Sequence, residues 1–493
     1  MAPSILNIIR GTYSTLLLIF SIILIMGLIA ERNTKISADV HPAMAYCTIW
    51  GAILWLMMVE GGQGSLVGLV PVNPKIYKDS HPVAARCTKI AHTGDNLDRY
   101  LLGRQFMVVL VVFTVNMSGG PSGDITLWGL PEWLKSIMFG GGAAMILFTC
   151  MVGQLNSQVI ASLCMLDYTN TYSALATLWV AMFIEWTGLL HSSYLISMLV
   201  SALAGKPVES KEPPRDLGGN ITFWVKCLYS LALLVFCFAV TLVALFDGKT
   251  TMWEGVPPIV AVIIFFILMS VVGMLEGMQI AFFAVAKVED SERGEAKFAK
   301  MTCDILFGGT GNNLPGFMIG RQLCVVSCMF FIARVTSVSI PDGENNIFGV
   351  SDGLQEFFNT GLLGAIITTI VGSITWQLVA AAFPLAFLAN PLTYILLRIC
   401  LFLEATGICS GAWVIAAVLK KLIGYQRDEI YIGTAEERAK MDMADNETLL
   451  NLGTGHVLKL PGFYESAPEA LRDLLIEDEG VADYVKSVYG EAK

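Results

Sequence analysis

Charged side chains stand inside apolar stretches of this sequence, where a bilayer makes a charge costly unless it has a function or a partner. The positions are Glu60, Arg104, Glu185, Glu276, Arg321 and Glu404. Two short motifs contain four of these residues, and each motif occurs twice. E-G-x-Q lies at residues 60–63 and 276–279, and G-R-Q lies at residues 103–105 and 320–322.

The amides of these motifs suit a small, neutral solute that carries hydroxyl groups. Glutamine donates and accepts hydrogen bonds, whereas arginine only donates and ionised glutamate only accepts. The candidate ligands are Gln63, Gln105, Gln279 and Gln322. Carboxylate and amide oxygens also suit a hard cation such as sodium, and the same groups could simply fix the motif helices. The candidates for that role are Glu60, Glu276, Asn96 and Asn313.

Each candidate also has a purely structural interpretation. Glu60 with Arg104, and Glu276 with Arg321, could neutralise one another as buried ion pairs. Close helix packing alone could require the motif glycines, which are Gly61, Gly103, Gly277 and Gly320. Hydrogen bonding between helices could explain the second group of matched residues, which are Gln158, Gln377, Glu185 and Glu404. Asp167 has no counterpart, and a membrane interface is its simplest location.

A membrane must position these residues. Of 493 residues, 55% are hydrophobic and 15% are charged, and the mean hydropathy is +0.64; a soluble domain is nearer half apolar and a quarter charged. Apolar segments lie near residues 14–30, 44–70, 102–118, 141–164, 172–203, 223–246, 257–286, 317–338, 360–385 and 391–419. We therefore predict an all-α polytopic membrane protein with ten transmembrane helices.

The motifs belong to a repeat of the whole half-chain. Asn96 and Asn313 have the same separation as the two G-R-Q motifs, and Gln158 precedes Gln377 by nearly the same interval. Five spans per half would reverse the second half, which predicts two inverted repeats of the kind found in secondary transporters. The predicted parts are a first repeat at 1–206, an extracellular linker at 207–222, a second repeat at 223–424 and an acidic cytoplasmic tail at 425–493.

The charge distribution bears on topology and partners. The net charge is −10, and the tail, with 15 acidic and 7 basic residues, supplies −8 of it. No basic face suits nucleic acid. The corresponding loops 71–101 and 287–316 contain five and four Lys/Arg residues, which the positive-inside rule does not explain for both loops if they face opposite sides. Basic residues after the last span, Lys420 and Lys421, predict cytoplasmic termini. S/T-x-x-E sequences at Thr434 and Ser466 predict short helices in the tail.

The paired motifs resemble those of the diatom silicon transporters, which carry E-G-x-Q and G-R-Q once in each half of a ten-span chain. The family's C-M-L-D motif also appears, at residues 164–167. The resemblance covers roughly residues 10 to 424. It implies sodium-coupled symport of silicic acid across the plasma membrane or vesicle membranes, with the four motif glutamines as ligands. The C-terminal coiled coil of many members has no counterpart, because no sustained heptad follows Gly424.

Other functions fit the same residues. A passive channel or facilitator could use the glutamines and arginines as a constriction for silicic acid or another small neutral hydroxide, such as boric or arsenious acid. An intramembrane enzyme could use Glu60 and Glu276 as acid and base. Such an enzyme would need a nucleophile or a metal, and no His/Cys/Asp cluster in the sequence supplies one; the 11 cysteines also form no zinc or redox pattern. We therefore expect no enzyme, no metal site and no cofactor beyond sodium as the coupling ion. The sequence leaves the oligomeric state undetermined.

Overall fold

The computed structural model describes residues 5–121, 127–205, 210–253, 255–285, 296–308, 313–340 and 345–433. Regular structure in these ranges is helical, apart from isolated β-bridges between Thr34 and Pro121 and between Thr250 and Val338. Residues 1–427 form one compact unit and residues 428–493 a second one. Most of the predicted tail, including both S/T-x-x-E sequences, lies outside the described residues.

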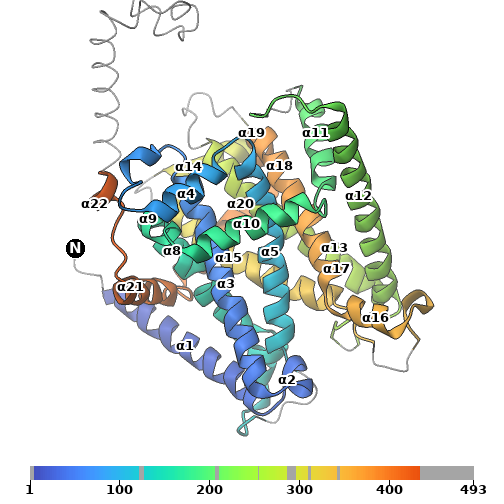
Figure 1. Ribbon diagram of the computed structural model, residues 1–493. Coiled ribbons are helices and arrows are strands. Elements are labelled where there is room, and N and C mark those ends of the chain that lie inside the picture. The colour runs from blue at the N-terminus through green and yellow to red at the C-terminus, as the bar shows by residue number, and fades with distance from the viewer. Residues whose placement is uncertain are drawn as a thin grey trace, which may run out of the picture. The chain divides into compact units, whose positions relative to one another are not determined.

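The first half contains four long helical segments (Figure 1). They are α1 (Ile5–Ala30), α3 (Pro42–Gly68), α5 (Asn96–Gly119), and a fourth that runs through α7 (Ala143–Phe148), the π-helix η3 (Thr149–Leu155) and α8 (Asn156–Leu163). Connections between them contain α2 (Lys35–Asp39), η1 (Pro74–Ile76), α4 (Pro82–Ala91), α6 (Glu132–Lys135), η2 (Ser136–Gly140) and α9 (Met165–Thr169). Two shorter helices follow, α10 (Tyr172–Trp186) and α11 (Ser192–Ala204).

The second half repeats this order. Its long segments are α12 (Leu217–Phe246), α13 (Pro258–Val285), α15 (Asn313–Thr336), and the run α17 (Leu362–Ile367), η6 (Thr368–Ile374) and α18 (Thr375–Ala382). Connections contain α14 (Lys297–Phe307), η5 (Ile347–Gly349), α16 (Asp352–Asn359) and α19 (Pro384–Leu388). The half ends with α20 (Pro391–Ala405) and α21 (Gly411–Ile423), and α22 (Glu429–Ile432) belongs to the second unit.

Within the described ranges, 7 helices are long and apolar enough to cross a membrane: α1, α3, α7–α8, α12, α13, α15 and α17–α18. This confirms an all-helical polytopic membrane protein. α5 is the counterpart of α15 in the first half. The two helices are equally long, with 24 residues each, and α5 packs along α3. At about 1.5 Å per residue it is about 36 Å long, so we count it as a further crossing helix.

The predicted spans 172–203 and 391–419 are not single helices. The first breaks between α10, with 15 residues, and α11, with 13, and the second breaks between α20 and α21. Gly188 and Gly407 stand in the two breaks with φ of +88° and +73°, a conformation that favours glycine. Each part is only about 20–22 Å long, less than the ~30 Å hydrocarbon core of a bilayer.

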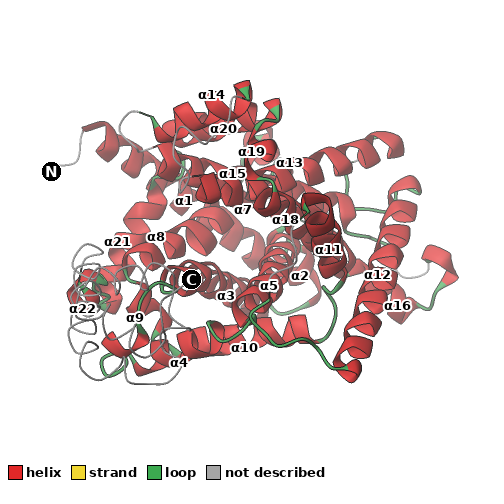
Figure 2. Ribbon diagram, turned by 90° about the horizontal axis from the view of Figure 1, so that it is seen from above, coloured by secondary structure: helices red, strands yellow, loops and turns green. Residues whose placement is uncertain are grey.

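Equivalent helices make equivalent contacts in the two halves. α3 packs against α5 as α13 packs against α15, and α5 packs against α10 as α15 packs against α20. The last helix of each half crosses to the other half, because α11 packs against α12 and α18, and α21 packs against α1 and α8. Figure 2 shows α1 and α21 on one side of α3 and α5, and α11 and α12 on the other. The two halves are therefore interleaved.

Equivalent ends of the two halves lie at the same end of this unit. A single cavity is lined by Lys35, which follows α1, by Gly120 at the end of α5, and by their counterparts Thr251 and Ser337, which follow α12 and α15. α2 and α16 lie at this end in Figure 1, and α4 and α14 lie at the other. There the segment before α12 meets the start of α5, where Ser210 Oγ donates to Asp95 Oδ2 over 2.5 Å.

These contacts argue against the predicted inversion, because inverted repeats would place equivalent helix ends on opposite faces. Four crossing helices per half, an even number, return the chain to its starting face, and the second half then runs in the same direction as the first. The broken fifth segment of each half begins and ends on one face. Residues 210–212 of the predicted linker 207–222 contact the start of α5, and its residues 217–222 belong to α12.

Cysteines introduced singly near α4 and α14 test whether the two repeats have the same orientation in the membrane. Lys78→Cys and Lys300→Cys, both at exposed positions, should react with a membrane-impermeant maleimide from the same face of sealed vesicles. Glu132→Cys should react from the opposite face. A Cys47→Ser background suits the experiment, since Cys47 is the exposed cysteine among the described ones. Labelling of residues 78 and 300 from opposite faces would restore the inverted arrangement.

Candidate functional site

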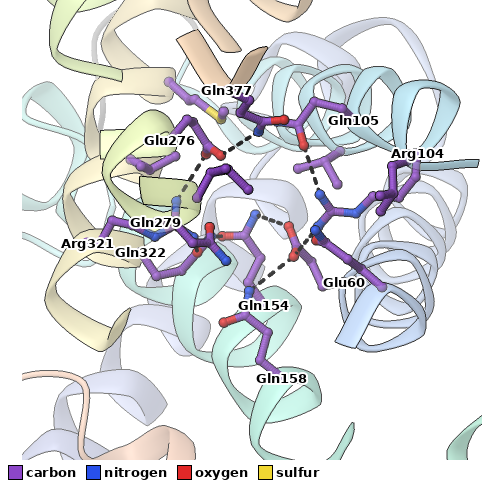
Figure 3. A pocket seen from close by; sticks show the side chains of 16 residues that line it. Glu60, Arg104, Gln105, Gln154, Gln158, Glu276, Gln279, Arg321, Gln322 and Gln377 are labelled. Carbon is purple, nitrogen blue, oxygen red and sulfur yellow. Dashed lines mark hydrogen bonds and ion pairs between the residues drawn. The ribbon is translucent and has the colours of Figure 1, made fainter. Parts of the chain in front are cut away.

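A polar cavity lies where the four motif helices meet (Figure 3). It offers about 80 Å³ to the centres of water-sized molecules, and one water takes ~10–15 Å³ on that measure, so a small solute fits. Its polar lining consists of Glu60, Gln63, Arg104, Gln105, Gln154, Gln158, Glu276, Gln279, Arg321, Gln322 and Gln377. The structure thus brings together both glutamates, both arginines and all four predicted glutamine ligands.

In the first half, Arg104 and Glu60 form a buried ion pair between α5 and α3. Arg104 Nη1 also donates to Gln105 Oε1 over 2.8 Å. Glu60 accepts further hydrogen bonds from the amides of Gln154 and Gln158, each over 3.1 Å. The carboxylate is therefore neutralised and its lone pairs are used, which is what a buried charge requires.

The second half repeats this arrangement between α15 and α13. Arg321 Nη1 donates to Glu276 Oε1 over 3.2 Å, and its Nη2 donates to Gln322 Oε1 over 2.7 Å. Gln377 Nε2 donates to the other oxygen of Glu276 over 3.0 Å. Both arginines thus orient the glutamine that follows them in the sequence, so that its amide nitrogen faces the opposite half.

Two hydrogen bonds cross between the halves at this site. Gln105 Nε2 donates to Ser373 Oγ over 2.8 Å, and Gln322 Nε2 donates to Gln154 Oε1 over 2.6 Å. Gln154 in η3 and Ser373 in η6 occupy equivalent positions and are both fully buried. The hydrogen bonds around the cavity therefore follow the same pattern in both halves. The acceptors differ, because one is the amide oxygen of Gln154 and the other is the hydroxyl of Ser373.

Sequence reasoning did not identify Gln154 or Ser373. Each follows a matched Val-Gly pair, 152–153 in one half and 371–372 in the other, and that pair was the available signal. The glycines allow close packing: a Cβ on Gly153 would lie 2.8 Å from Leu56 Cδ2. The π-helical turns that hold both residues are uncommon and occur often at functional sites.

Gln63 and Gln279 differ from the other motif glutamines. Both are half-buried in the cavity wall, and neither has a hydrogen-bonded partner among the described residues. Gln105 and Gln322, by contrast, each use their carbonyl oxygen and one amide hydrogen within the protein. Gln63 and Gln279 therefore keep both donors and the acceptor of their amides for a solute.

Several predicted residues lie outside the cavity. Asn96 Nδ2 donates to the Ile90 carbonyl over 2.9 Å, and Asn313 Nδ2 donates to the Ile305 carbonyl over 2.6 Å. These bonds fasten the start of each G-R-Q helix to the short helix before it, α4 or α14. Both asparagines therefore have a structural partner away from Glu60 and Glu276.

The remaining predicted residues lie at breaks and connections. Glu185 lies in the last turn of α10 and accepts a 2.8 Å hydrogen bond from the Tyr194 hydroxyl. Glu404 is half-buried near the end of α20. Asp167 accepts a hydrogen bond from the Gln426 backbone over 2.6 Å and lies 3.2 Å from His81 Nε2. Asp167 thus joins the first half to the segment that leaves α21.

The motif glycines allow helices to touch. A Cβ on Gly103 would overlap the carbonyl oxygen of Ala181 in α10, and one on Gly320 would overlap that of Cys400 in α20. Gly61 and Gly277 pack in the same way against aromatic rings that follow the fourth segment of each half. The helix-packing interpretation explains all four glycines, which makes them part of the site's frame.

Comparison with known families gives one match over nearly the whole chain, to the family described as silicon transporter, at residues 2–490. The chain belongs to the silicon transporter family. No curated protein and no solved structure matches it. The resemblance predicted from the paired motifs is therefore confirmed, and the family together with the apolar helices makes this a multi-pass membrane transporter whose substrate class is silicon.

Alanine at Gly103 or Gly320 should lower the thermal stability of the purified protein strongly, because the new Cβ overlaps a backbone carbonyl that cannot rotate away. Overpacking of this kind costs about 1–3 kcal/mol or more. Gly64→Ala is the matched control, since its Cβ would meet only Ala161 Cβ at 3.8 Å. Equal unfolding temperatures for Gly103→Ala and Gly64→Ala would contradict this packing role.

Gln154→Leu should destabilise the protein more than Gln158→Leu. Both changes remove one hydrogen bond to Glu60 at similar side-chain volume, but only the first also leaves Gln322 Nε2 without its partner in the other half. A buried donor without a partner costs about 1–3 kcal/mol, which thermal unfolding of the two variants would resolve. If both variants unfold at the same temperature, the hydrogen bond between Gln322 and Gln154 does not contribute to stability.

Proposed function

We propose that this protein is a sodium-coupled symporter of silicic acid that works by alternating access. The observation that carries the proposal is the cavity itself, which presents amides and contains two arginines that are each neutralised by a glutamate. Silicic acid is mostly uncharged near neutral pH and presents only hydroxyl groups. A neutral, amide-lined site matches such a solute, whereas a site with uncompensated arginines would favour anions.

In this mechanism Gln63 and Gln279 are the principal ligands, because their amides have no competing partners among the described residues. Gln105 and Gln322 are held by the arginines and contribute the amide hydrogen that each has left. The solute would exchange its hydration hydrogen bonds for these amides at little net cost, which suits a site that must also release it.

Glu60 and Glu276 act in this proposal chiefly as supports of the motif helices. Glu60 already accepts hydrogen bonds from three side chains, and Glu276 from two. The cavity by itself requires no sodium, so the coupling ion rests on the family resemblance. Alternating access would break and remake the crossing bonds of Gln105 and Gln322 as the two halves move.

We also propose that the end bearing α4 and α14 faces the cytoplasm of a plasma-membrane protein. The loops 71–101 and 287–316 contain five and four Lys/Arg residues, and Lys420 and Lys421 lie in the last turn of α21. The positive-inside rule places such loops in the cytoplasm, and two repeats of one orientation let both loops obey it. The same arrangement puts both termini on that side.

Uptake of silicic acid into proteoliposomes, with and without an inward sodium gradient, tests the coupled mechanism. We expect accumulation above the external concentration only when the gradient is present. Uptake that merely equilibrates, with or without sodium, would instead establish a passive channel. No silicic acid uptake under either condition would refute the substrate.

Alanine at Gln63 or Gln279 should raise the half-saturating silicic acid concentration about 5- to 10-fold, the equivalent of roughly 1 kcal/mol for a lost hydrogen bond. Thermal stability should stay near that of the parent protein, because neither amide bonds a described neighbour. The exposed Gln426 offers a control as Gln426→Ala. Unchanged half-saturation in both cavity variants would remove these glutamines from the binding site.

A further inference from the structure

A second cavity lies between the C-terminal ends of α5 and α15, away from the motif residues. Its polar lining comes from both halves: Lys35 and Asn116 from the first, and Thr251, Arg334 and Ser337 from the second. Asn116 and Ser337 are 8% and 1% exposed. No part of the transport mechanism above uses these residues.

Three polar atoms in this wall are buried without a hydrogen-bond partner among the described residues: Asn116 Nδ2, Arg334 Nε and Ser337 Oγ. An unsatisfied buried polar atom costs about 1–3 kcal/mol, and native proteins contain few of them. All three can donate a hydrogen bond. Their gathering around one cavity therefore indicates a missing acceptor.

The positive charge of the cavity wall also indicates a missing acceptor. Lys35 and Arg334 both line it, and neither forms an ion pair with a carboxylate in the part of the chain that the structure describes. The pKa of Lys35 is lowered, chiefly because the side chain is buried and in addition because Arg334 carries a positive charge nearby. An acceptor that also carries negative charge would favour the protonated lysine and offset both effects.

The surrounding backbone and an aromatic ring hold the cationic groups in place. The Lys35 backbone N–H donates to the Gly120 carbonyl over 3.3 Å, and the Thr251 hydroxyl donates to the Arg334 carbonyl over 2.8 Å. The Arg334 guanidinium lies 4.9 Å from the centre of the Trp253 ring. Trp253 Nε1 in turn donates to the Gly140 carbonyl over 3.2 Å. The cavity is thus framed before any ligand enters.

We propose that this cavity binds a small inorganic anion, of the size and charge of chloride, between Lys35 and Asn116 of one half and Arg334 and Ser337 of the other. The rest of the wall is apolar or without free donors, and includes Phe330, Ala333 and Pro121. It therefore suits a monovalent spherical ion better than a large oxyanion. The bound anion links the two repeats at the end opposite α4 and α14.

Thermal unfolding of the full-length protein in sodium chloride, sodium gluconate and sodium sulfate tests this, with all three salts at equal ionic strength and the first two also at equal sodium concentration. We expect a saturable rise of several degrees in chloride over gluconate. Lys35→Met and Arg334→Gln should each abolish the rise. Lys135→Met is the matched control, because Lys135 pairs with Glu132 at 2.8 Å and lies outside the cavity; it should keep the chloride effect.

A second readout uses the unaltered cavity. Bromide should quench the fluorescence of Trp253, measured as the difference between the parent protein and Trp253→Phe, with saturation that chloride competes away. Equal stability in chloride and gluconate together with no saturable quenching would overturn the proposal. Stabilisation by sulfate but not by chloride would overturn the assignment to a small monovalent ion.

Discussion

The buried ion pair between the E-G-x-Q glutamate and the G-R-Q arginine is the interaction on which the rest of the site depends. A charge inside a membrane protein needs an opposite charge and hydrogen bonds to its remaining polar atoms. Glu60 with Arg104, and Glu276 with Arg321, satisfy this need and bind α3 to α5 and α13 to α15. Because each arginine also holds the following glutamine, the same pair that cancels the charge also aims the amide at the other half.

Neutralisation explains the chemistry of the cavity better than any single residue does. Four charged groups lie within it, yet their pairing leaves amides as the groups that a solute meets. The two halves then share one site, since Gln105 and Gln322 each bond a side chain from the opposite half. At the equivalent accepting positions the two halves differ, since one carries Gln154 and the other Ser373.

The orientation of the repeats follows from how the fifth segment of each half is built. α10 and α11 are too short to cross a bilayer singly, and contacts at the start of α5 return the chain to its original face. Four crossing helices per half then make the repeats parallel. This also accounts for the Lys/Arg residues of loops 71–101 and 287–316, because two corresponding loops can face the same compartment only if the halves run in the same direction.

The sequence by itself determined the membrane class, the repeat, the family and the motif residues of the cavity, because the cost of charge in lipid and the recurrence of E-G-x-Q and G-R-Q can be recognised from the residues alone. Tertiary structure decided what depends on distance. It showed that the amides of Gln63 and Gln279 have no partner among the described residues, whereas those of Gln105 and Gln322 are hydrogen-bonded. It also placed Asn96 and Asn313 outside the cavity, Gln154 in its wall, and Ser373 as the acceptor of Gln105. Hydropathy identifies apolar segments but does not distinguish one spanning helix from two short helices that return to the same face, such as α10 and α11. The direction of the second repeat could therefore be found only from contacts in the folded chain.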